Sequence, residues 1–202
     1  HSFPTRRSSD LFHNLESNYS SGYLTFPVVG AGTANTEFEV LTGMSMQYFG
    51  TGEYPYKTIL KQTDCESIAS DLSKIGYGTH VVHNNTATFY SRNNAFSMMG
   101  FDTFTSKELM NITQYTPNGN WPTDDILVQE TVKALDSTKD QSDFVYTITV
   151  EGHGDYPTEK ILTDPAIRVS GAATEESNNQ WEYYVNMIHE VDDFIGDLIT
   201  AV

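Results

Sequence analysis

The stretch FVYTITV, residues 144–150, decides the fold class of this chain of 202 residues. It consists of β-branched and aromatic residues throughout, which favours a buried strand. A shorter run, THVVH at residues 79–83, predicts a second buried strand. The prediction of strands among helical patterns indicates an α/β fold with a largely parallel sheet.

Apolar residues recur at helical spacing in four segments, at residues 34–46, 56–75, 124–135 and 179–202. The first helix is expected to start near Thr33, with Thr36 and Glu39 placed like a capping box. The second is expected to break near Thr63. The last carries one long apolar stripe, which predicts a helix that covers the sheet.

The composition limits both the class of protein and its partners. Hydrophobic residues make up 38% and aromatic residues 12% of the chain, too many for a disordered protein. The formal net charge of −16 predicts that the protein does not bind nucleic acid. The same charge repels anionic substrates, so a phosphate site here needs strong local positive charge.

The two ends of the chain indicate a partial domain. Residues 1–11, HSFPTRRSSDL, lack the apolar stretch of a signal peptide and are interpreted as a non-native leader. The chain has no initiator Met, and it stops directly after a strong helical pattern. We therefore expect residues 12–202 to be one catalytic domain that is incomplete at both ends. No run of 18 apolar residues is present, so no membrane span is predicted.

Three polar residues lie where chemistry collects in open α/β sheets, at the carboxyl ends of strands. Thr33 follows the glycine turn at residues 30–32, His83 ends a strand, and His153 stands between two glycines. A hydroxyl at a helix start can bind a divalent metal and attack phosphorus. The alternative for Thr33 is an ordinary turn and helix cap.

Arg92 follows His83 by nine residues, and its planar guanidinium can hold a phosphate while His83 donates a hydrogen bond. The alternative is a surface loop with a solvated arginine. His153 is a candidate for contact with the substrate or its leaving group, and the alternative there is a structural turn.

Other candidate residues are interpreted as structural. His80 and His189 are expected to have structural roles. Asp192 and Asp193 are read as a solvated helix edge. Cys65, the single cysteine, has no partner for an internal disulfide and is read as a helix residue without chemistry, in an acidic setting that raises the thiol pKa.

The order of these motifs resembles the lipoteichoic acid synthase-like family of phosphoglycerol transferases, over residues 12–202. The segment TANTEFEVLTG at 33–43 resembles the catalytic segment, and FYSR at 89–92 matches the family's aromatic-x-Arg pattern. FSMMGFDTF at 96–104 resembles its Gly-Phe-Asp-x-Phe stretch, and TVEGH at 149–153 its strand-exit histidine.

The resemblance implies an alkaline phosphatase/sulfatase-like fold and a Mn²⁺- or Mg²⁺-dependent enzyme. Thr33 would be nucleophile and metal ligand, and His83, Arg92 and His153 would bind substrate. The reaction implied is glycerophosphate transfer from phosphatidylglycerol through a phosphothreonine, toward a glycerophosphate polymer of the cell envelope. The domain would lie outside the cell membrane, anchored by transmembrane segments missing from this chain.

The chain departs from the family at two metal motifs. The family's metal-binding glutamate and its Asp-His pair would fall before and after these residues. The remaining ligands are therefore expected outside this chain, and the chain by itself is expected to bind metal poorly and to be inactive.

Several alternatives stay open at this point. A formylglycine sulfatase is disfavoured, because Cys65 lacks the Pro and Arg that its motif requires. A related phosphoethanolamine transferase, a phosphoglycerol or sulfuric-ester hydrolase, and a non-catalytic polyanion-binding module of the same fold all fit the sequence.

Overall fold

The computed structural model describes residues 10–25 and 32–202, and the chain divides into two compact units. The sheet unit contains the described residues from Gly22 to Leu109, together with Lys133–Ile148. The α6 unit contains the described residues up to Ser21, Met110–Val132 and Thr149–Val202. Each unit is described by itself.

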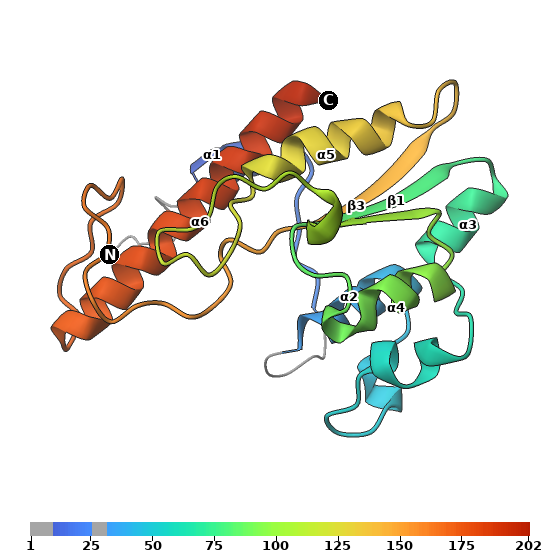
Figure 1. Cartoon of the computed structure of the whole chain (residues 1–202), viewed down its shortest axis with the longest axis horizontal. Helices are drawn as coiled ribbons and strands as arrows, with labels where there is room; N and C mark the ends of the chain where they lie inside the picture. Colours follow the sequence, from blue (N-terminus) through green and yellow to red (C-terminus); the bar gives the residue numbers. More distant parts are fainter. Residues whose placement is uncertain (1–9, 26–31) are drawn as a thin grey trace. The chain divides into compact units, whose positions relative to one another are not determined.

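A three-stranded parallel sheet organises the sheet unit (Figure 1). Its strands are β1 (Gly78–His83), β2 (Thr103–Ser106) and β3 (Asp143–Ile148), in the order β2-β1-β3. Both pairings of β1 are parallel, which confirms the predicted α/β class. The strand predicted at 144–150 ends at Ile148, and β2 was not predicted.

Helices α2 (Thr33–Thr42) and α4 (Arg92–Met98) lie below the sheet in Figure 1, and α3 (Ile68–Lys74) lies at its right-hand end. One apolar cluster joins them to the strands; it includes Phe38, Leu41, Ala69, Val81, Phe96 and Met99. Tyr146 lies opposite Val81 in the register and packs against this cluster. Each large side chain buried in this way contributes about 1.5–3 kcal/mol, which fixes the helices on one face.

Helix α2 begins at Thr33 as predicted but is capped differently. Gly32 precedes it without a side-chain cap, and the helix ends before Gly43, whose φ is +69°. The capping box expected from Thr36 and Glu39 was wrong, because the helix starts three residues earlier. Glu39 is buried and accepts a hydrogen bond from the backbone N–H of Met46 instead.

The single helix predicted over residues 56–75 is three short elements. Two 3₁₀ turns, Pro55–Lys57 and Ile59–Lys61, precede α3. The break falls where expected, near Thr63. The polar segment that follows runs without helical structure until Ser67 caps the next helix.

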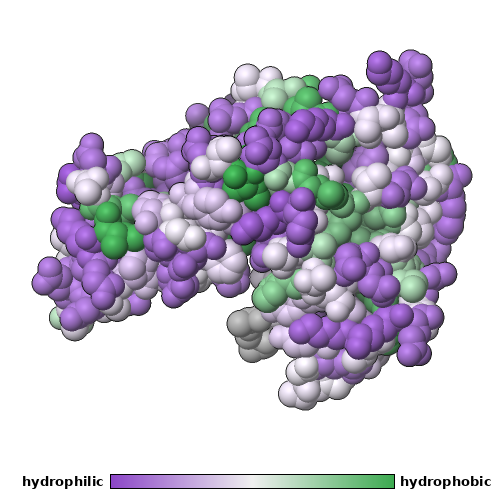
Figure 2. All heavy atoms as spheres, in the orientation of Figure 1, coloured by the Kyte–Doolittle hydropathy of each residue, from purple (hydrophilic) through white to green (hydrophobic). Residues whose placement is uncertain are grey.

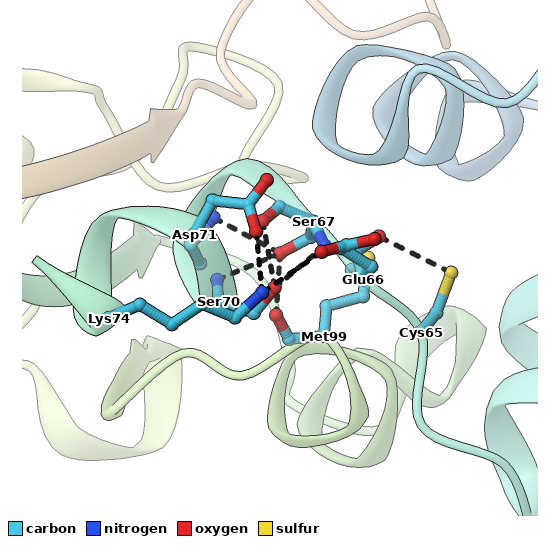
Figure 3. A network of polar contacts seen from close by, with 8 residues as sticks. Cys65, Glu66, Ser67, Ser70, Asp71, Lys74 and Met99 are labelled. Atoms are coloured by element: carbon cyan, nitrogen blue, oxygen red, sulfur yellow. Dashed lines mark hydrogen bonds and ion pairs between the residues drawn. The ribbon is translucent and has the colours of Figure 1, made fainter.

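Ser67 and Ser70 form a capping box that sets the start of α3 (Figure 3). The Ser67 hydroxyl accepts from the N–H groups of Ala69 and Ser70 and donates to the Met99 carbonyl at 2.5 Å. An N-cap of this kind contributes about 1 kcal/mol.

Cys65 lies in the non-helical segment before α3, so its expected place in a helix was wrong. Burial, and then the charge of Glu66, raises the pKa of its thiol, which confirms the predicted direction. The thiol therefore stays protonated and unreactive at neutral pH.

The α6 unit is built around α6 (Glu175–Ala201), with α1 (Asp10–Asn18) beside it. The buried carboxylate of Asp192 accepts from the N–H groups of Leu11 and Phe12, at 2.8 and 2.9 Å. These N–H groups have no partner within the first turn of α1. Asp192 is therefore not part of a solvated helix edge, contrary to the sequence interpretation.

Helix α5 (Asp125–Asp136) matches the helix predicted over residues 124–135.

The face drawn in Figure 2 is mostly hydrophilic, with apolar side chains in small patches. Across the described ranges, no helix combines the length and the apolar character that a membrane crossing requires.

Candidate functional site

Thr33 is the first residue of α2 and is exposed, so its hydroxyl is accessible to a ligand. The N–H groups of a helix start carry positive partial charge and attract anions. A Cβ at Gly32 would lie 3.0 Å from Cε1 of Tyr54, so a larger residue there would displace that ring by a few tenths of an ångström. Gly30 and Ala31 of the predicted turn lie outside the described residues.

Arg92 is buried at the start of α4 and points toward Thr33. Its Nη2 lies 3.4 Å from Thr33 Oγ1, which makes a long hydrogen bond. The alternative of a solvated surface arginine was wrong. The structure thus brings two of the predicted site residues together.

Glu37 holds this arginine in place and was missed in the sequence. Its carboxylate accepts from Nε of Arg92 at 3.1 Å and from Nη2 at 2.5 Å, and both residues are buried. Glu37 lies one helical turn after Thr33, on the same side of α2. The sequence shows this spacing, but the burial of the Glu37 and Arg92 charges depends on tertiary packing.

The charge of Glu37 also acts on two phenols, the buried Tyr56 and the partly buried Tyr146. Burial, and then Glu37, raises the pKa of Tyr56 and of Tyr146. Both phenols therefore stay neutral, and Arg92 is the cation that compensates this carboxylate.

The backbone before Arg92 is strained. Tyr90 and Ser91 have φ values of +57° and +59°, in the left-handed region that side chains avoid. Such strain costs about 1–3 kcal/mol per residue and clusters at functional sites. The Tyr90 ring stacks on Tyr54 at 5.2 Å, and the guanidinium of Arg92 lies 5.2 Å from the same ring.

Lys57 adds a second positive charge to this cluster. Its Nζ lies 5.0 Å from the centre of the Tyr90 ring and 5.3 Å from that of Tyr54. Cation–π contacts of this kind contribute about 0.5–1 kcal/mol at exposed sites. Because Glu37 compensates Arg92, Lys57 is the cation of this cluster that pairs with no carboxylate among the described residues.

His83 ends β1 as predicted and is buried. Its Nδ1 donates to the Ile148 carbonyl at 2.8 Å, which leaves Nε2 as the acceptor in the neutral ring. Burial, and then the charge of Arg92, lowers the pKa of His83 to about 4. The ring is therefore neutral at pH 7, and in that state Nε2 cannot donate to a phosphate as the sequence suggested.

The pKa of His83 predicts an acid-sensitive fold. Between pH 6.5 and about 4 the unfolded ring binds a proton that the folded ring does not. We expect the free energy of unfolding to fall as the pH drops through this window, by about 3 kcal/mol at most. Urea denaturation at several pH values should show that the free energy of unfolding falls less steeply with decreasing pH for His83→Gln than for wild type. A matched variant of the partly exposed His13, His13→Gln, should keep the wild-type slope; equal slopes in all three proteins would contradict the prediction.

His153 lies in an exposed turn of the α6 unit, held by Trp121. The two rings are 4.7 Å apart, and Nε1 of Trp121 donates to the Gly154 carbonyl at 3.1 Å. Within the sheet unit, Arg92 is hydrogen-bonded to Thr33, and the charge of Arg92 acts on His83. His153 belongs to the α6 unit.

Glu151, beside this turn, is a second buried acid that the sequence did not indicate. Its carboxylate accepts the N–H of Asp124 at 2.9 Å, and Asp124 accepts the N–H groups of Val150 and Glu151. Burial raises the pKa of Glu151 to about 8, and the charge of Asp124 adds to this effect. The carboxyl is therefore largely protonated at pH 7.

The remaining histidines behave as expected for structural residues. Buried His80 contacts Thr103 Oγ1 through Nδ1 at 2.7 Å and Asp143 through Nε2 at 3.2 Å. His189 lies 3.8 Å from the carboxylate of Asp193 on α6.

The described residues do not form a complete metal site. Within residues 10–25 and 32–202, no group of three or more His, Cys, Asp and Glu side chains could hold a metal ion. Thr33 is the one ligand that the sequence assigns, and one ligand does not make a site.

Comparison with solved structures supports the fold. The chain superposes on the lipoteichoic acid synthase LtaP of Listeria monocytogenes with a TM-score of 0.77 and 22% identity, covering 96% of this chain and 45% of that one. The Streptococcus pyogenes phosphoglycerol transferase GacH, in complex with sn-glycerol-1-phosphate, gives 0.76 and 18%, covering 96% and 50%. The periplasmic domain of EcEptC from Escherichia coli, in complex with Zn, gives 0.59 and 14%, covering 97% and 53%.

Comparison of sequences identifies the family. The chain is 30% identical over 178 residues to a Rhizobium meliloti (strain 1021) protein named "Putative cyclic beta-1,2-glucan modification protein", covering 88% of this chain and 27% of that protein. The chain thus spans about a quarter of this relative and about half of the solved structures. The model of the sulfatase family matches residues 7–202. This chain belongs to the sulfatase family and has the fold of the alkaline phosphatase superfamily.

Proposed function

We propose that the intact protein transfers glycerophosphate from an anionic lipid, phosphatidylglycerol, to an alcohol acceptor through a phosphothreonine at Thr33. The observation that carries this proposal is the buried Arg92, fixed by Glu37 with its Nη2 3.4 Å from the Thr33 hydroxyl. A nucleophilic hydroxyl beside an oriented guanidinium suits attack on a phosphodiester.

The proposed reaction has two displacements at phosphorus. In the first, Oγ1 of Thr33 bonds to phosphorus, the bond to the diacylglycerol oxygen breaks, and the departing alcohol takes up a proton. In the second, an acceptor hydroxyl attacks, the bond from phosphorus to Thr33 breaks, and Thr33 regains its proton. Arg92 donates to the non-bridging oxygens as charge shifts onto them.

Other groups have supporting roles in this proposal. Neutral His83 binds substrate by accepting a hydrogen bond from a glycerol hydroxyl at Nε2. His153 protonates the leaving alcohol or binds the glycerol phosphate. A divalent cation, Mn²⁺ or Mg²⁺, would lower the pKa of the Thr33 hydroxyl when bound.

The acceptor and the location belong to the same proposal. The Rhizobium meliloti relative is named for cyclic β-1,2-glucan modification, so we propose a glucan hydroxyl as acceptor, with a glycerophosphate polymer as the alternative. The reaction would take place at the extracellular face of the cell membrane. Anchoring segments beyond these residues would hold the domain there.

The test uses the intact protein with phosphatidylglycerol labelled in its headgroup, a glucan, and Mn²⁺. We expect labelled glycerophosphate on the glucan and release of diacylglycerol, both detected by mass spectrometry. Transfer from phosphatidylethanolamine instead would identify a phosphoethanolamine transferase, and free glycerol phosphate alone would identify a hydrolase. Binding without turnover of any lipid would identify a non-catalytic module; each of these three results would reject the proposed reaction.

A further inference from the structure

The α6 unit contains a groove lined by three aromatic side chains and an amide. Tyr156, Gln180, Trp181 and Tyr184 enclose a volume of about 530 Å³. All four residues belong to this one unit. Small-molecule sites have volumes of about 300–1,000 Å³, so the groove is large enough for a sugar ring.

The aromatic rings of the groove meet at an angle and are not stacked face to face. Trp181 and Tyr184 meet edge to face at 5.9 Å, and the Tyr156 ring is tilted by 58° from that of Tyr184. Trp181 is 51% exposed. A cluster of large aromatic side chains that stays open to water is typical of a binding surface.

Hydrogen bonds hold the groove in a defined shape. Nε2 of Gln180 donates to the backbone carbonyl of Tyr156 at 3.2 Å. The Tyr156 hydroxyl donates to the Gly152 carbonyl at 3.0 Å. Both side chains are thus ordered before a ligand arrives, which lowers the entropic cost of binding.

The charge around the groove selects a neutral ligand. Glu175 and Glu176 lie in the first turn of α6, the helix that carries three of the four lining residues, and the whole chain carries −16. An anionic polymer would be repelled here. A pyranose places weakly positive C–H groups on one face, which suits the negative face of an aromatic ring, and its hydroxyls suit an amide.

We propose that this groove binds a neutral sugar ring of the glycan acceptor, an inference that rests on the proposed function. The groove lies in the same unit as His153, and the Tyr156 hydroxyl is bonded to the carbonyl of Gly152, the residue before His153.

Isothermal titration of the intact protein with a short neutral β-glucan oligosaccharide tests this proposal without any need for turnover. We expect Trp181→Ala to weaken binding about tenfold, in line with the loss of one stacking platform. Trp181→Phe should recover part of the affinity, because a smaller ring face remains. Tyr48→Ala removes an exposed aromatic side chain from the sheet unit, and this variant should bind as wild type does.

The outcomes separate this inference from the proposed function. Equal affinities in wild type, Trp181→Ala and Trp181→Phe, each confirmed as folded by thermal unfolding, would overturn the groove assignment. Competition by polyglycerophosphate at Trp181 would overturn the neutral-ligand assignment. Glucan binding that depends on Trp181, in a protein that transfers nothing from phosphatidylglycerol, would support the groove and reject the proposed reaction.

Discussion

Thr33→Ala is expected to abolish glycerophosphate transfer by the intact protein, lowering kcat by at least about 10³-fold. The substitution removes the protein atom that the proposed reaction bonds to phosphorus. Its cost in stability should be within about 0.5 kcal/mol, because Thr33 is exposed and its contact with Arg92 is long. Intact-mass spectrometry during turnover should find a phosphorylated species in wild type and none in the variant.

Two control variants make this result interpretable. Thr33→Ser keeps a hydroxyl at the helix start and should retain measurable transfer. Thr36→Ala, on the same helix, should transfer at the wild-type rate. Turnover by Thr33→Ala at the wild-type rate would show that Thr33 is not the nucleophile, whatever the role of Arg92.

Glu37→Ala is expected to destabilise the protein by about 3–5 kcal/mol, because it leaves the Arg92 guanidinium buried without a counter-charge. Urea denaturation measures this change. The double variant Glu37→Leu/Arg92→Met removes both charges and should recover much of the loss, since the desolvation cost disappears with them. Comparison of the single variant with the double variant therefore shows whether the loss of stability comes from the buried charge or from the lost side-chain volume.

An exposed ion pair provides the matched comparison. Lys74 bonds to Glu66 and Asp71 at 2.9 Å, but all three side chains are more than half exposed. Lys74→Ala should therefore cost less than about 1 kcal/mol. A Glu37→Ala loss as small as this, or a double variant as unstable as the single one, would show that the Glu37 contact does not stabilise the fold.

Local patterns predicted the elements whose signals lie in a few neighbouring residues. The apolar run that ends at His83 and the glycine before Thr33 set a strand end and a helix start without help from the rest of the chain. By contrast, β2 is only four residues long, so its sequence, TFTS at 103–106, is too short to predict a strand although it contains β-branched and aromatic residues. Its position follows from pairing with β1.

The missed site residues share a physical cause. Glu37, Glu151 and Asp192 are acidic residues on helices or loops, where an exposed position is the usual outcome. Each is buried because a partner from elsewhere in the chain supplies hydrogen-bond donors: Arg92 is 55 positions from Glu37, and Leu11 is 181 positions from Asp192. Such pairs are visible only once the tertiary fold is known.

The hydrogen bonds from Leu11 and Phe12 to Asp192 also bear on where a recombinant version of this domain can be cut. A chain that starts at His13 would lose both donors and leave the carboxylate dehydrated in the middle of α6. A boundary placed before Asp10 keeps that contact, so expression trials should include these residues.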